Sequence, residues 1–100
     1  SLLCLGQCRS PAEIMNVAGP DIVPVRFLAE ELARRLGRNV RFVGEEGATA
    51  YLNNASRSYR LLGLPRVSLG EMLDWTAQWF LAGGRSLGKP THFTTKDGKF

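Results

Sequence analysis

The chain has 100 residues, of which 13 are Lys or Arg and 9 are Asp or Glu, so its formal net charge is +4. Apolar residues make up 44%, which is typical of a folded globular domain and excludes a disordered or disulfide-dense chain. No apolar run reaches the roughly 18 residues of a membrane-spanning helix. A chain this short also has little material to wall a deep catalytic cavity, so it is not a complete large-cofactor enzyme.

The basic residues are scattered along the chain, which favours a solvated surface over a nucleic-acid interface. In the densest stretch, Arg34 and Arg35 follow Glu30 and Glu31 by one helical turn, the spacing of helical ion pairs. No unopposed basic stripe with interleaved aromatic residues is present. We therefore expect neither a nucleic acid nor a membrane as a partner.

Cys4 and Cys8 lie in an apolar opening segment, SLLCLGQC. If the segment is helical, the two thiols lie one turn apart, which suits a disulfide poorly because the Cβ vectors must converge. Together with the distant His92 they still fall short of a four-ligand zinc site. The sequence therefore predicts reduced thiols, no bound metal and a cytoplasmic location.

The first half of the chain predicts strand, helix and strand in that order. Residues 13–18 (EIMNVA) form a short apolar run that ends in turn residues, Gly-Pro-Asp, and predict a strand. A one-faced apolar stripe predicts a helix over residues 24–36, with Gly37 as its stop. Residues 40–43 (VRFV) are β-branched or aromatic apart from one arginine and predict a second strand.

The second half predicts two helices. Asn53 or Asn54 can cap a short helix over residues 55–62. Ser68 and Glu71 form a capping box before a long helix that ends at Gly83-Gly84. Its Trp75 and Trp79 are one turn apart; we expect them in the core, with a ligand-stacking platform as the alternative.

The tail of the chain carries a hairpin signal and a single histidine, and neither indicates catalysis. Asp97-Gly98 between short apolar arms is a hairpin signal. His92 is the only histidine, and no Ser-His-Asp or Cys-His set can be assembled around it. No glycine-rich turn precedes a helix, so no phosphate-binding loop is present either.

The order of these segments resembles the C-terminal part of an extended short-chain dehydrogenase/reductase, the NAD-dependent epimerase/dehydratase family. Members show a strand ending in N-x-x-G, as in residues 16–19 (NVAG), then a helix and a short strand. A segment similar to D-x-S-[KR]-A-x-x-x-L-G-[WY]-x-P follows, here over residues 54–65. Asn54 replaces the usual Asp, Leu64 replaces the aromatic residue, and Pro65 comes one residue early. The resemblance covers about residues 13–81.

The resemblance implies an α/β fold: a small C-terminal substrate-binding lobe with about three helices packed on short strands, detached from its Rossmann domain. Residues 1–100 would be one domain, with the end of a preceding helix and loop at 1–12, the lobe core at 13–82 and a tail at 83–100. The family's cofactor-binding glycines and its Y-x-x-x-K pair belong to the N-terminal part. NAD or NADP would therefore be bound by the parent enzyme, and this chain would hold no cofactor and no catalytic residue.

The resemblance also suggests which residues meet a small-molecule substrate. The loop over residues 44–54 would face the nicotinamide domain, with Tyr51, Asn53 and Arg57 able to reach the substrate. The alternative is that Tyr51 packs on the last helix, Asn53 and Asn54 only cap, and Arg57 is solvated.

Two positions bear on the substrate's identity. Sugar-nucleotide members carry R-x-x-D a few residues before the A-Y-[WL] stretch, and Gly44 and Gly47 occupy those two places here. A glycine has no side chain that could form an ion pair with a phosphate or a hydrogen bond with a ribose hydroxyl. These two positions therefore argue against a nucleotide sugar as the substrate.

Two further expectations concern partners. If residues 13–18 normally pair with a Rossmann sheet, their free backbone groups would drive homodimers of this chain. The rival interpretation is a stand-alone basic binding or interaction module with no enzymatic role.

We predict that this 100-residue chain does not bind NAD(H) above background, because it has neither a glycine-rich phosphate loop nor a tyrosine-lysine pair. Isothermal titration calorimetry of the chain with NAD+ and NADH measures this directly. Micromolar affinity would contradict the prediction.

Overall fold

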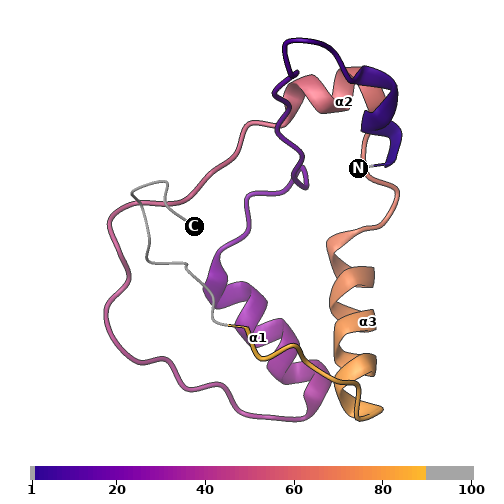
Figure 1. The fold of residues 1–100 in the computed structure, drawn as a ribbon. Helices are drawn as coiled ribbons and strands as arrows, with labels where there is room; N and C mark the ends of the chain where they lie inside the picture. The colour runs from indigo at the N-terminus through magenta and orange to yellow at the C-terminus, as the bar shows by residue number, and fades with distance from the viewer. Residues whose placement is uncertain (1, 90–100) are drawn as a thin grey trace.

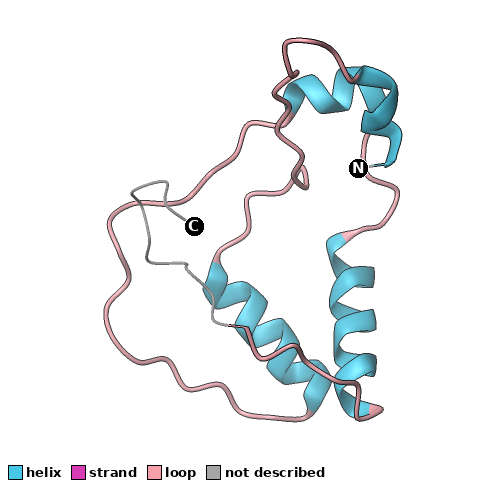
Figure 2. Cartoon of the chain, viewed as in Figure 1, coloured by secondary structure: helices cyan, strands magenta, loops and turns pink. Residues whose placement is uncertain are grey.

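The computed structural model describes residues 2–89 and shows four helical elements joined by long loops (Figure 1). A 3-10 helix, η1, spans Leu2–Gln7, and three α-helices follow: α1 at Val25–Leu36, α2 at Ser56–Leu62 and α3 at Leu69–Leu81. No strand occurs between residues 2 and 89 (Figure 2). The predicted hairpin around Asp97-Gly98 and the histidine His92 lie outside the described residues.

The predicted α/β fold, with helices packed on short strands, is therefore wrong. Residues 13–18 and 40–43 have the composition of strands, but neither segment adopts strand structure, and no second strand lies beside either to form a ladder. Residues 13–18 are instead bonded to side chains of α2, and Phe42 lies against Arg26, whose guanidinium carbon is 4.1 Å from the ring centroid. β-propensity reports how well a residue fits a sheet surface, and it does not supply the sheet.

Helix α1 confirms the helix predicted over residues 24–36, with Pro24 as its N-cap. Pro24 suits this position because a helix leaves its first N–H groups unbonded. The helix ends where Gly37 turns into the left-handed region at φ 62°, and Arg38 N–H donates to the Ala33 carbonyl at 2.9 Å. A glycine at this position adopts the left-handed conformation without a Cβ clash.

Helix α3 confirms the predicted capping box. The Glu71 N–H donates to Ser68 Oγ at 3.2 Å, and the Ser68 N–H donates to Glu71 Oε2 at 2.9 Å. The bonds from the Ser68 N–H and hydroxyl lower the pKa of Glu71. Ser68 and Glu71 thus define where the helix begins, as the sequence indicated.

The C-terminus of α3 positions a tryptophan. Gly83 adopts φ 75°, and the Gly84 N–H donates to the Trp79 carbonyl at 2.8 Å. A Cβ at residue 84 would lie on the Trp79 ring, and the indole N–H donates to the Arg85 carbonyl at 3.2 Å. The indole is therefore held in one orientation although 57% of the residue is exposed.

Helices α1 and α3 pack against each other, and Arg35 joins them (Figure 1). Leu73 and Ala77 are the buried residues of α3. Arg35 Nε lies 2.6 Å from Asp74 Oδ1 on α3, and its guanidinium also pairs with Glu31 one turn earlier on α1. Bonds from Arg34 and Arg35 lower the pKa of Glu31 to about 2.

Most apolar side chains among residues 2–89 are exposed or only half-buried. The accessible surface is 9213 Å2, whereas a compact monomer of 100 residues exposes about 5,600 Å2. The radius of gyration is 16.6 Å against about 13 Å for a compact domain of this length. Trp75 and Trp79 are each 57% exposed, so the expectation that they lie in the core is wrong. Exposed large side chains occur on every helical element: Leu2, Leu5, Phe27, Leu61, Met72, Phe80 and Leu81.

The ion pairs of the Glu31 carboxylate within α1 make the stability of the chain dependent on pH. The pKa of Glu31 is lowered in the folded chain from 4.5 to about 2, so its stabilising effect is complete above 4.5 and is lost as the pH falls towards 2. We predict that thermal unfolding, followed by circular dichroism, shifts to lower temperature across this range.

Replacement of Glu31 by Gln should remove part of this pH dependence, and the remainder should come from Glu71, whose pKa is lowered in the same direction. The matched control is Glu30→Gln, because Glu30 has no ion pair among residues 2–89. An equal effect of both substitutions would contradict the assignment to Glu31.

Candidate functional site

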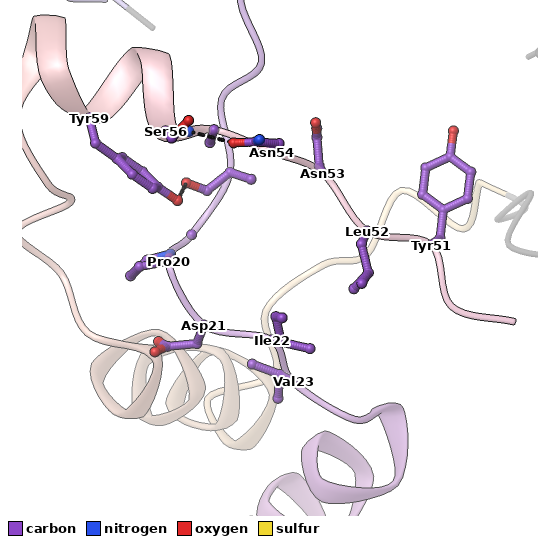
Figure 3. Close-up of a pocket in the computed structure, with 13 residues that line it drawn as sticks. Pro20, Asp21, Ile22, Val23, Tyr51, Leu52, Asn53, Asn54, Ser56 and Tyr59 are labelled. Carbon is purple, nitrogen blue, oxygen red and sulfur yellow. Dashed lines mark hydrogen bonds between the residues drawn. The ribbon is translucent and has the colours of Figure 1, made fainter.

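A groove lies between two segments that are far apart in the sequence, residues 18–23 and residues 51–56 (Figure 3). Its volume is about 630 Å3, and Tyr59 on the first turns of α2 lines one end. The first segment leads into α1 and the second leads into α2, so the groove lies between the approaches to two helices (Figure 1).

Hydrogen bonds join residues 14–18, which lead into the first segment of the groove, to α2 and to the residues just before it. The Tyr59 hydroxyl donates to the Ala18 carbonyl at 3.0 Å, and the Asn16 amide donates to the Asn54 carbonyl at 3.2 Å. Arg57 donates to the Ile14 carbonyl at 3.3 Å. Residues 14, 16 and 18 are thus each bonded to α2 or to the segment just before it, two through their carbonyls and one through its side chain. Two of the carbonyls that a strand would offer to a sheet are bonded to side chains instead.

The entry to α2 is closed by local hydrogen bonds. The Ser56 N–H donates to Asn54 Oδ1 at 3.0 Å, and the Ser58 hydroxyl donates to the Ala55 carbonyl at 2.8 Å. Ala55 and Ser58 are buried, which makes this turn one of the few enclosed parts of the chain. Of the two asparagines predicted as caps, only Asn54 makes such a bond.

The structure brings together two of the three predicted substrate-binding residues. Tyr51 and Asn53 both line the groove, and both are exposed; Tyr51 is 77% exposed and therefore does not pack on the last helix. Figure 3 shows the Leu52 side chain directed towards Ile22, while Tyr51 and Asn53 point to the other side of their segment. Neither Tyr51 nor Asn53 makes a side-chain hydrogen bond with other residues of the described chain.

Arg57 is placed differently from its predicted role. It does not line the groove, and its guanidinium pairs with Glu13 as well as with the Ile14 carbonyl. The family resemblance suggested that Arg57, at the entry to the helix, could reach the substrate. The partner that engages it lies 44 residues earlier, and nothing local in the sequence indicates this pairing.

The groove carries little charge. Asp21 is the only charged residue that lines it, and no described lysine or arginine does so. Asp21, Tyr59 and Asn16 were not predicted as parts of the site. Asn16 was identified within the N-x-x-G pattern, but its bond to the second segment depends on a contact between positions 38 residues apart.

Neither a metal centre nor a redox pair is formed in the part of the chain that the structure describes. No group of three His, Cys, Asp or Glu side chains comes together between residues 2 and 89. Cys4 is half-buried and Cys8 is exposed, and both are free thiols, as predicted. None of the described helices has the length and apolar character needed to cross a membrane.

Comparison of the chain with models of protein families, with curated proteins and with solved structures finds no match.

The two tyrosines of the groove should respond differently to loss of their hydroxyl groups. We predict that Tyr59→Phe destabilises the chain by about 1 kcal/mol, because the Ala18 carbonyl loses its donor. Tyr51→Phe should leave stability nearly unchanged, because that hydroxyl has no partner among residues 2–89. Urea unfolding of both variants checks this, and equal effects would show that the Tyr59 bond does not hold the groove together.

Proposed function

We propose that this chain is the substrate-binding region of a larger NAD(P)-dependent epimerase, dehydratase or reductase. The observation that carries the proposal is the large exposed surface: the total accessible surface exceeds that of a compact domain by roughly 60%, and many large apolar side chains lie on it. A surface of this size is costly to leave in water, and a second folded unit would cover it. The groove then supplies a place for a small molecule beside that unit.

In such an enzyme the cofactor would be bound by residues outside this 100-residue chain. The described chain has no glycine-rich turn before a helix, and α1 begins after Val23-Pro24. NAD or NADP would be bound by an N-terminal Rossmann domain of the parent chain, which is also the partner that covers the apolar surface. The free thiols agree with a cytoplasmic location for such an enzyme.

The second candidate function is a stand-alone basic interaction module. One observation favours it: several exposed arginines have neither an ion pair nor a side-chain hydrogen bond within residues 2–89. These arginines are Arg38, Arg41, Arg60 and Arg66. They give the surface an excess of positive charge that an acidic partner would complement.

The coding sequence upstream of Ser1 separates the two candidates. A G-x-x-G-x-x-G near the start of a longer open reading frame, followed by Y-x-x-x-K before Ser1, supports the enzyme. An open reading frame that begins at Ser1 would contradict the enzyme function and would leave the interaction module as the remaining candidate.

In the longer enzyme, we predict that Tyr51→Phe and Asn53→Ala each lower kcat/KM. The expected decrease corresponds to a loss of about 1–2 kcal/mol of transition-state stabilisation. Both residues line the groove and are exposed, so each is free to contact a substrate without supporting the fold. Steady-state kinetics and the melting temperature should be measured together.

The matched control is Arg57→Lys, because Arg57 lies outside the groove and is engaged by Glu13. We expect this substitution to change the melting temperature more than it changes kcat/KM. Unchanged kinetics in both Tyr51→Phe and Asn53→Ala would exclude the groove as the substrate site.

A further inference from the structure

The side of α3 that faces away from α1 carries exposed apolar side chains, and among residues 2–89 only α1 makes an extended contact with α3 (Figure 1). We propose that this α3 ridge, formed by Met72, Trp75 and Trp79, binds the same ridge of a second copy of the chain around a twofold axis. This contact differs from the pairing of residues 13–18 predicted from the sequence, because two carbonyls of that segment are bonded to side chains.

The α3 ridge lies on one side of its helix. Met72, Trp75 and Trp79 are spaced by three and then four residues, which places them one above the other on the helix surface. Leu73 and Ala77, the buried residues of α3, lie on the opposite side of the helix. Met72 is 47% exposed and each tryptophan is 57% exposed. The contact with α1 therefore leaves the ridge accessible to a partner.

Two polar groups beside this ridge are already bonded within the chain. The Thr76 hydroxyl donates to the Met72 carbonyl at 2.7 Å, and the Trp79 indole N–H donates to the Arg85 carbonyl at 3.2 Å. Neither group loses a partner when water is removed from the ridge. The backbone of Gly84 also packs against the Trp79 ring and holds it in place before any partner binds. An aromatic side chain that is already ordered loses less conformational entropy on association.

The distribution of charge favours α3 as the contact between two copies. The chain carries a net charge of +4, so two copies repel each other in general. Helices α1 and α2 contain arginines, whereas α3 contains neither Lys nor Arg. Its two acidic residues are engaged within the chain, Glu71 in the capping box and Asp74 with Arg35. Two copies that meet through α3 therefore bring no helix of unpaired arginines into the contact.

The order of residues along the ridge suits a twofold axis. Trp75 lies nearest the midpoint between Met72 and Trp79, so an axis beside it places Trp75 against its own counterpart. Met72 then lies near the partner's Trp79. Aromatic pairs and contacts between a thioether and an aromatic ring are both favourable. The ridge contains no charged side chain, so the symmetry brings no like charges together.

The exposed surface is large enough for such a dimer. It exceeds that of a compact monomer of this length by about 3,600 Å2. Each partner of a standard interface contributes about 800 Å2. A dimer centred on the ridge uses only part of the excess and leaves the rest for the N-terminal domain of the proposed function. The inference does not rest on that function, because it concerns two copies of the 100-residue chain alone.

Sedimentation of the 100-residue chain between about 5 and 500 µM measures the association directly. We expect monomers at low concentration and dimers at high concentration, without larger species, because a twofold contact closes on itself. NMR spectra over the same range locate the contact. The indole N–H signals of both tryptophans and the amides of residues 72–79 should shift with concentration, and the amides of α2 should not.

Two substitutions at the expected axis test the symmetry. Trp75→Glu and Trp75→Lys each place like charges against each other, so each should weaken dimerisation at least about 30-fold. An equimolar mixture of the two variants should associate more tightly than either variant alone, because opposite charges then meet. The matched control is Val25→Glu, which puts the same charge on a helix residue that is 77% exposed and outside α3. Dimerisation should persist in this control.

Four results would overturn the inference: a monomer at every concentration, growth beyond dimers, dimers that both Trp75 variants retain, or a mixture no tighter than its components. A monomer would leave the ridge to a different partner, such as the N-terminal domain. If circular dichroism shows that the Trp75 variants do not fold, the NMR spectra of the unchanged chain decide, and shifts confined to residues outside 72–79 contradict the inference. The upstream motifs that test the proposed function enter none of these measurements, so the two can fail separately.

Discussion

Helices α1 and α3 cover only one side of each other, and this limits how much of the chain can be buried. Arg35 fixes their relative position through Asp74, and Leu73 and Ala77 fill the contact. The opposite side of α3 carries Met72, Trp75 and Trp79, which remain exposed. A helix that is apolar on two sides needs two neighbours, and the described chain provides one. The long loops and the large accessible surface both follow from this shortage of neighbours.

The hydrogen bonds around α2 compensate locally for the missing core. Tyr59 and Asn16 connect segments separated by about 40 residues, and each bond ends on a backbone carbonyl. The Tyr59 bond requires no particular side chain at residue 18, whereas the other bond depends on the side-chain amide of Asn16 on the extended segment itself. The groove therefore depends on a few polar side chains near α2 and on little buried apolar surface.

Sequence patterns predicted the helices well because helices depend on nearby residues. Gly37, the capping box at Ser68 and the stop at Gly83 all act within one turn, and each is found where it was predicted. The prediction of strands was wrong for residues 2–89, because a strand needs a partner that its own sequence does not specify. Tyr51 and Asn53 are close in sequence and line one groove, whereas the pairing of Arg57 with Glu13 depends on a contact across 44 residues.

The packing of Trp79 against Gly84 links two positions that sequence comparison treats separately. Any side chain at residue 84 would occupy the space of the indole ring, and the preceding residue, Gly83, takes the left-handed φ of 75° that turns the chain after α3. A larger residue could be accommodated there only if the residue at position 79 became smaller or turned away. Among relatives of this chain, we therefore expect the residues at positions 79 and 84 to vary together rather than independently.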